Sequence, residues 1–340
     1  MKYSNIASDQ QSELFASLRT LAEQSQRLEV KLNARLDELV GLLESRDSFL
    51  SRASSAHTLL GTLAAVQDEV KKVSYQQRVL RSLEYPGMDA GREMVRPTYA
   101  NTLHWIFEGD SGRLRASKYT RWLERGIFWI SGKPGSGKST LMKYISHHEQ
   151  TSALLRNCAG KGTELVVASH YLWIAGTCMQ KSQLGLLQSL LMAILRQCPS
   201  LIGDIEVGAS VSQGKHDVTS SVPHHWSQEL LFAALEKLKN KDLRAGGKPV
   251  KFCYFIDGLD EYKRPDGNDH EDHIMEVLEA ILRSSNNIKL CVASRPWNAF
   301  ERILGNPSNH DRSLKVQYHT KPDTEAFARG KIGGMSGLRT

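Results

Sequence analysis

A glycine-rich loop between an apolar run and a helix-forming run constrains the fold of this chain more than any other feature. Residues 127–131 form the apolar run and are typical of a buried strand. Residues 141–146 read as the first turns of a helix, and the loop before them fits the pattern G-x-x-x-x-G-K-[ST]. The loop consists of Gly132, Lys133, Pro134, Gly135, Ser136, Gly137, Lys138, Ser139 and Thr140. The order strand, loop, helix is that of a phosphate-binding loop.

Each part of this loop has a physical reason to bind phosphate. Glycines let successive backbone N–H groups wrap around a polyphosphate, and the helix N-terminus adds partial positive charge. We expect Lys138 to neutralise the outer phosphates and the Ser139 hydroxyl to hold Mg²⁺. A glycine-rich turn that only joins a strand to a helix is the alternative, and the flanking pattern disfavours it.

Three carboxylates follow a second apolar run, residues 252–256. They are Asp257, Asp260 and Glu261, and like charges so close together repel unless a cation or solvent compensates them. At the carboxyl end of a parallel strand beside a phosphate loop, that cation would be Mg²⁺. We expect Asp257 to bind the ion, and Asp260 or Glu261 to activate the attacking water as general base. A solvated acidic strand exit is the alternative.

A third apolar run, residues 288–293, ends in Ser294 and Arg295. If this strand lies between the other two, Arg295 would reach toward the γ-phosphate, stabilise the charge on the transferring group and distinguish tri- from diphosphate. The alternative is a surface arginine that pairs with a carboxylate such as Asp257 or Asp260.

The composition excludes several classes of function. The 340-residue chain has the apolar and charged fractions of an ordinary soluble globular protein. Its net charge of +7 is spread without a basic run, which argues against a nucleic-acid partner. The five cysteines lack C-x-x-C spacing, which favours a reducing compartment over a disulfide framework or zinc site. Since neither a secretory signal nor an apolar span of about 18 residues is visible, we expect a cytoplasmic protein without a membrane span.

Residues 85–328 alternate apolar strands with amphipathic helices, which predicts an α/β fold with a mostly parallel, five-stranded sheet of the P-loop NTPase type. The expected strands are residues 127–131, 166–173, 250–256, 288–293 and 314–318. The expected helices are residues 138–150, 180–197, 225–239, 270–283 and 297–304. Residues 200–223 read as an exposed irregular excursion, and the glycine-containing tail, residues 329–340, is expected to be disordered.

Residues 1–84 lack proline and predict a separate helical or coiled-coil region before the α/β domain. An alternating three-and-four spacing relates Leu14, Leu18, Leu21, Leu28, Leu32, Leu39 and Leu42, with Ser25 and Arg35 at the two missing positions. After a small-residue break at residues 51–56, a second helical stretch carries Leu59, Leu63, Val66, Val70 and Val73. Self-association or protein partners through these helices, and an intramolecular helical hairpin, both fit the pattern.

With these elements the chain resembles a NACHT-type signal-transducing NTPase of the STAND class, within the ASCE group of P-loop folds. More narrowly, it resembles the fungal NOD-like receptor group, whose module is often labelled a nephrocystin-like N-terminal domain. The resemblance covers residues 80–328 and rests on residues 127–140, 257–261 and 293–297. Residues 170–173 and 180–191 are similar to the second strand and helix of that group. Residues 82–88 and 102–107 are similar to its lead-in, which packs near the nucleobase in related proteins.

The resemblance implies a switch between diphosphate and triphosphate states, with slow hydrolysis and a role in innate-immunity or heterokaryon-incompatibility signalling. It also implies ATP as the nucleotide, with GTP as the alternative. Family members continue past the sheet into a helical lid, a winged-helix domain and repeats. Residues 316–332 resemble the start of that continuation, so we expect a module truncated before the winged helix, whose diphosphate-gripping histidine has no candidate position here.

The sequence therefore predicts a nucleoside-triphosphate-binding signalling switch with weak Mg²⁺-dependent NTPase activity. The alternative is a non-catalytic interaction or decoy protein that pairs with a full-length relative through its N-terminal helices. A P-loop kinase would need an acceptor-substrate lid and a nucleic-acid motor would need basic strand-binding loops, and neither is identifiable in the sequence.

Overall fold

A computed structural model describes residue 34 and residues 49–99, 102–108, 117–122, 126–205, 225–240, 242–263, 271–282, 287–305 and 312–336. The leucine stripe predicted over residues 14–42 lies outside the described residues, apart from the helical Ala34. The chain divides into two compact units, Met1–Tyr75 and Gln76–Thr340. Helix α2 (Phe49–Leu83) supplies most of the described part of the first unit and the beginning of the second.

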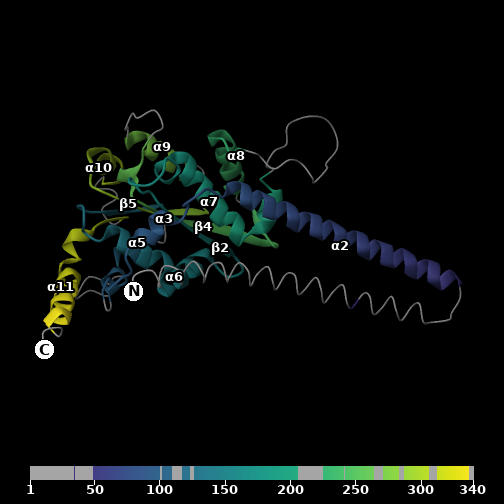
Figure 1. Cartoon of the computed structure of the whole chain (residues 1–340), viewed down its shortest axis with the longest axis horizontal. Helices are drawn as coiled ribbons and strands as arrows, with labels where there is room; N and C mark the ends of the chain where they lie inside the picture. The colour runs from purple at the N-terminus through teal and green to yellow at the C-terminus, as the bar shows by residue number, and fades with distance from the viewer. Residues whose placement is uncertain are drawn as a thin grey trace. The chain divides into compact units, whose positions relative to one another are not determined.

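The second unit is built on a mostly parallel sheet. Its strands lie side by side in the order β2 (Glu164–Tyr171), β4 (Lys248–Asp257), β5 (Ile288–Ser294), β1 (Ile127–Ser131) and β6 (Ser313–Lys315). Figure 1 labels β2, β4 and β5 of this sheet. Each neighbouring pair is parallel, and a short β3 (Arg244–Ala245) runs antiparallel to the start of β4. This confirms the predicted α/β fold, and β5 lies between β1 and β4, as the argument about Arg295 requires.

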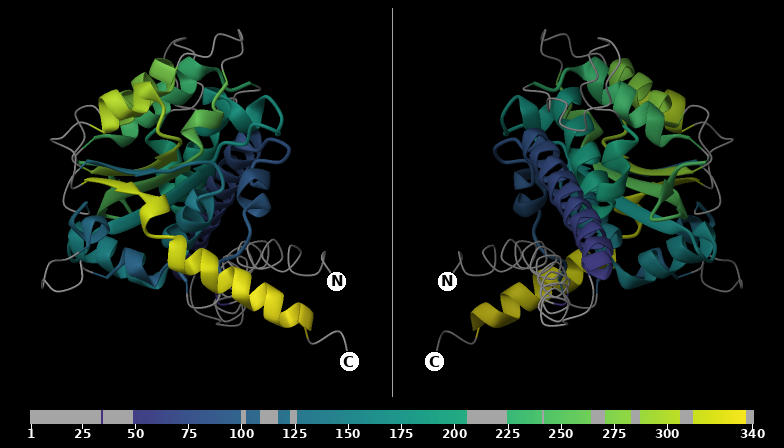
Figure 2. Two further views of the ribbon diagram at one scale, coloured as in Figure 1. Left: turned by 90° about the vertical axis from the view of Figure 1, so that its left-hand side faces the viewer. Right: turned by 90° about the vertical axis from the view of Figure 1, so that its right-hand side faces the viewer.

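Helices cover both faces of this sheet (Figure 2). On one face, Phe128, Cys253 and Cys291 belong to a buried core that also includes residues of α4, α5 and α6. The register places Trp129, Ile256 and Val292 on the opposite face, because their strand neighbours alternate sides. The helices are α3 (Ala90–Met94), α4 (Lys118–Trp122), α5 (Lys138–His147), α6 (Glu149–Ala159), α7 (Gln183–Gln197), α8 (Gln228–Leu238), α9 (Glu271–Leu282), α10 (Asn298–Leu304) and α11 (Lys321–Ser336).

Capping side chains, rather than the apolar pattern, decide where several helices begin. The Ser182 and Ser227 hydroxyls accept backbone N–H groups at the starts of α7 and α8, so both helices begin three residues later than predicted. The single helix predicted over residues 138–150 is two helices, α5 and α6. His148 between them has an extended backbone, and its Nδ1 accepts the Gln150 N–H at 3.1 Å.

The structure corrects two predictions in the second half of the chain. Residues 316–318 form a 3₁₀ turn, η6, instead of extending β6, because the pairing with β1 ends at Lys315 opposite Ser131. Residues 200–205 are not an exposed excursion, since Leu201, Ile202 and Ile205 are buried around the 3₁₀ turn η3 (Pro199–Gly203). Residues 206–223 of that predicted excursion lie outside the described part of the chain.

Two further predictions concern helices α2 and α11. The small-residue break at residues 51–56 is wrong, since α2 is continuous there, and serine and alanine are compatible with a helix interior. Helix α11 extends to Ser336, into the tail predicted to be disordered. The glycine content of residues 329–340 suggested disorder. Helix α11 nevertheless continues into this tail, because a helix whose first turn is already formed propagates more readily than one that must nucleate alone. Within the described residues, no helix combines the length and the apolarity needed to cross a bilayer.

Candidate functional site

The glycine loop turns directly from β1 into α5. The Gly132 N–H donates to the Ser294 carbonyl at 3.3 Å, which holds the start of the loop against the end of β5. Gly137 is the N-cap of α5 and has φ 89°, a backbone conformation that a side chain disfavours. The first N–H groups of α5 have no partner within the helix, so the loop ends where unpaired donors concentrate.

Lys138 folds back over this loop. Its Nζ donates to the Gly132 carbonyl at 2.9 Å and to the Lys133 carbonyl at 3.2 Å. Burial lowers the pKa of Lys138, and the neighbouring carboxylates of Asp260 and Asp257 oppose that effect. The lysine of the loop is therefore within electrostatic range of the acidic side chains at the carboxyl end of β4.

Asp257, the last residue of β4, is buried beside α5. Its Oδ1 has no hydrogen-bond partner among the described residues, and Ser139 of the glycine loop lies nearby. Burial raises the pKa of Asp257 to about 7, and the nearby Ser139 side chain acts in the opposite direction. A buried carboxylate with an unpartnered oxygen is costly unless a cation compensates it. The two residues predicted to bind magnesium therefore lie near each other, and one oxygen of the carboxylate lacks a hydrogen-bond partner among the described residues.

Asp260 and Arg295 form an ion pair just beyond the carboxyl ends of β4 and β5. The Arg295 Nε lies 2.9 Å from Asp260 Oδ2, and the Arg295 backbone N–H donates to Oδ1 at 2.9 Å. The sequence is compatible with an Arg295 that faces phosphate and with one that pairs with a carboxylate such as Asp260. In this structure it pairs with Asp260.

Glu261 follows on the 3₁₀ turn η4 (Leu259–Glu261) and has a different partner. Its Oε2 accepts the Ile174 backbone N–H at 2.8 Å, from the segment that follows β2. Gly258, which has φ 77°, begins this turn and donates its N–H to the Ala293 carbonyl of β5 at 3.0 Å. The acidic turn is therefore tied to both strands that flank β4.

Sequence reasoning missed a contact from the segment after β6. The Thr320 hydroxyl donates to the Ser136 carbonyl of the glycine loop at 3.2 Å. The Gln317 side chain also reaches the loop: a Cβ added at Gly132 would lie 3.0 Å from Gln317 Oε1 and 2.5 Å from Ser136 Oγ. No local pattern marks these residues, because only the chain's return along β1 brings them to the loop.

The lead-in segment meets the start of α11 near the same place. The Leu103 backbone N–H and the Trp105 Nε1–H both donate to Asp323 Oδ2, at 3.2 and 2.8 Å. The Trp105 ring stacks on His319 with centroids 4.9 Å apart. The predicted lead-in thus contacts His319, and the next residue, Thr320, contacts the glycine loop.

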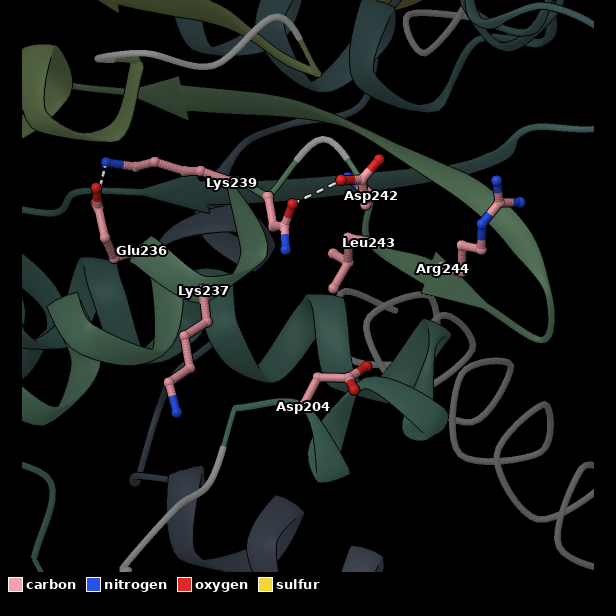
Figure 3. A pocket seen from close by; sticks show the side chains of 8 residues that line it. Asp204, Glu236, Lys237, Lys239, Asp242, Leu243 and Arg244 are labelled. Carbon is pink, nitrogen blue, oxygen red and sulfur yellow. Dashed lines mark hydrogen bonds and ion pairs between the residues drawn. The ribbon is translucent and has the colours of Figure 1, made fainter.

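A separate open hollow of about 630 Å³ lies around the β3 hairpin (Figure 3). It includes Arg244 of β3, which pairs with the start of β4, whereas Asp257 lies at the opposite end of β4. Its charged groups compensate one another in part, since Lys239 pairs with Glu236. None of the predicted site residues lines this hollow.

Comparison with known protein families agrees with this architecture. The sequence profile described as Nephrocystin 3, N-terminal, matches residues 101–295, more than half of the chain. The matched span contains the glycine loop and the acidic turn and ends at Arg295. A comparison with curated proteins finds no match. The chain therefore belongs to the nephrocystin 3 N-terminal family.

Proposed function

We propose that this chain binds a nucleoside triphosphate and acts as a switch module of the NACHT and STAND type, with slow Mg²⁺-dependent hydrolysis. The observation that carries the proposal is the buried Asp257 at the carboxyl end of β4, whose Oδ1 has no hydrogen-bond partner among the described residues. This carboxylate lies near Ser139 at the end of the glycine loop, which is the arrangement that phosphate and metal binding require. ATP is proposed over GTP from the family resemblance, because no base-reading motif such as N-K-x-D is present.

The residues around Asp257 fit a magnesium ion. Mg²⁺ prefers oxygen ligands, and the Ser139 hydroxyl lies near a carboxylate whose Oδ1 lacks a hydrogen-bond partner among the described residues. Ser139 and Asp257 would hold the ion, which when bound would neutralise charge on the outer phosphates. Burial raises the pKa of Asp257 and so favours its neutral form. A bound cation would act in the opposite direction, because its charge favours the ionised carboxylate.

The remaining roles follow from the donors around the loop. Lys138 would exchange the carbonyls of Gly132 and Lys133 for phosphate oxygens, and the N–H groups at the start of α5 would donate to the same ligand. Arg295 would contact the terminal phosphate through its guanidinium. Asp260 or Glu261 would accept the proton of the attacking water.

Binding of MgATP to the wild type and to Lys138→Ala tests this proposal. We expect the variant to bind at least about tenfold more weakly, because it loses a charge-assisted contact to phosphate. Isothermal titration calorimetry measures the affinity. Lys161→Ala is the matched control, since Lys161 is an exposed lysine in the turn before β2 and should leave the affinity unchanged.

Equal affinity of the wild type and Lys138→Ala for MgATP would contradict the phosphate-loop assignment. Nucleotide extracted from the purified chain gives a second reading, since chromatography of the extract identifies both the base and the number of phosphates. An extract that contains guanine nucleotides would overturn the choice of ATP and leave the phosphate loop intact.

A further inference from the structure

We infer that Asp260 is a positioning residue, which holds the guanidinium of Arg295 ready for the terminal phosphate, and that Glu261 is left to activate water. This inference rests on the proposed function, and it decides between the two acids that the sequence left open.

Asp260 holds Arg295 at two points. One carboxylate oxygen accepts the Arg295 backbone N–H at 2.9 Å, and the other lies 2.9 Å from Arg295 Nε. A contact to both the main chain and the side chain restricts the backbone and the side-chain torsions of the arginine together. Since the guanidinium has five N–H donors, the use of Nε still leaves four on the terminal nitrogens for a phosphate.

The exposures of the two side chains also favour this division of roles. The Asp260 side chain is 4% exposed, whereas the Arg295 side chain is 40% exposed. A general base needs an oxygen that can accept a proton from water, but both Asp260 oxygens already accept N–H groups. By contrast, the backbone N–H and Nε of Arg295 are held by Asp260, while its side chain remains accessible to solvent.

The backbone around Arg295 is fixed from β1 as well. The Trp129 Nε1–H donates to Ser294 Oγ at 2.9 Å, and that hydroxyl donates to the Arg295 carbonyl at 3.0 Å. The charge of Arg295 also acts on the ammonium of Lys138, which places the guanidinium within electrostatic range of the glycine loop. Arg295 is therefore held from the strands on both sides of β5.

Glu261 is held less completely. Only its Oε2 accepts a described hydrogen bond, from the Ile174 N–H at 2.8 Å. The other oxygen of this carboxylate is the one that we assign to the attacking water.

A double-mutant cycle on Asp260→Asn and Arg295→Gln tests the inference. The measured quantity is the ratio of affinities for AMP-PNP, a non-hydrolysable triphosphate, and ADP, each with Mg²⁺. We expect each single variant to lose roughly ten- to hundredfold of the preference for triphosphate, because one charge-assisted contact is lost. The double variant should lose no more than either single variant, since both changes remove the same contact.

Glu261→Gln is the matched carboxylate-to-amide control. It should retain the affinity ratio and lose ATP hydrolysis, measured as phosphate release. An unchanged ratio in Asp260→Asn would overturn the inference, as would losses that multiply in the double variant. If Asp260→Asn retains its affinity for ADP, the variant is folded. If that affinity is lost, the inference stands only when Asp260→Glu, which keeps the charge, restores the preference for triphosphate.

The wild type and Lys138→Ala separate this inference from the proposed function. If the wild type binds AMP-PNP and ADP equally but Lys138→Ala weakens both, the phosphate loop stands and the assignment of Arg295 and Asp260 fails. If Lys138→Ala binds both nucleotides as the wild type does, the proposed function itself fails.

Discussion

Asp257 and His170 are both buried near the carboxyl ends of their strands, and burial disfavours the charged form of each. It raises the pKa of Asp257 to about 7 and lowers the pKa of His170 to about 4. His170 Nε2 has no hydrogen-bond partner among the described residues, so nothing offsets the lost hydration. The two residues differ in what surrounds them: Asp257 lies beside Ser139 and Lys138, whereas burial alone accounts for the shift at His170.

His170 should make the fold sensitive to mild acid. Its folded pKa of about 4 is below the unfolded value of about 6.5, so the unfolded chain binds the proton first as the pH falls. The stability associated with neutral His170 is therefore complete above the unfolded pKa and is lost as the pH falls toward the folded pKa. From pH 7 to pH 5 this amounts to about 2 kcal/mol of unfolding free energy.

Urea unfolding of His170→Leu at these two pH values measures this effect. The variant should lose about 2 kcal/mol less than the wild type between pH 7 and pH 5. Comparing the two proteins removes contributions that they share, such as the opposite one expected from the raised pKa of Asp257. His225→Leu, at an exposed histidine, should keep the wild-type difference, and a wild-type difference in His170→Leu would contradict the assignment.

At the scale of the elements, the glycine loop is closely packed at its first residue, Gly132. A methyl group added there would meet both the Ser136 and the Gln317 side chains. The loop is thus shaped by the turn after β6 as well as by its own glycines.

Gly132→Ala should destabilise the fold by about 1 to 3 kcal/mol, because the added Cβ would lie 2.5 Å from Ser136 Oγ. Urea unfolding measures the loss. Adding Ser136→Ala to the same chain removes that oxygen and should recover part of the stability. A double variant that is as unstable as Gly132→Ala alone would show that the contact with Ser136 is not the cause.

The sequence located the strands well and the helix boundaries less well. Strand β1 matches its predicted residues, and β4 and β5 lie within three residues of theirs, because a continuous apolar run ends where polar residues begin. The division between α5 and α6 was missed, since the apolar pattern continues across His148 while the backbone does not. Local apolar patterns report burial, whereas a helix end depends on one residue's backbone and its hydrogen bond.

At the scale of the whole molecule, the boundary between the two units differs from the predicted one. The sequence placed it at Tyr85 and Pro86, where proline interrupts the helical pattern, but the structural division falls after Tyr75. The last turns of α2 belong to the second unit. Val79 and Leu83 are fully buried there, and the Trp226 Nε1–H donates to Ser82 Oγ at 3.0 Å.

A chain that begins at residue 76 should therefore be more stable than one that begins at residue 85. The shorter chain loses two buried apolar side chains and their hydrogen-bonded neighbours, on the order of 5 kcal/mol. For a unit of this size that corresponds to a Tm lower by roughly 10 to 20 °C, measured by circular dichroism. Equal Tm values would place the boundary at the proline, as the sequence predicted.

The assembly behaviour and signalling roles implied by the resemblance stay predictions, as do the cytoplasmic location and the non-catalytic alternative. They depend on partners and on residues outside the described part of the chain. The family match and the parallel sheet support the nucleotide-binding half of the prediction more directly, because both include the segments that carry it.

The sequence by itself determined the α/β class, the strand–loop–helix order around Lys138 and the acidic end of β4, because each follows from short-range pattern and spacing. Only the tertiary structure decided that Arg295 pairs with Asp260, that Ser139 lies near Asp257 and that Thr320 contacts the glycine loop. These contacts depend on the order of strands in the sheet, where β5 lies between β1 and β4. Strand order is set by the packing of distant segments, and no local run of residues encodes it.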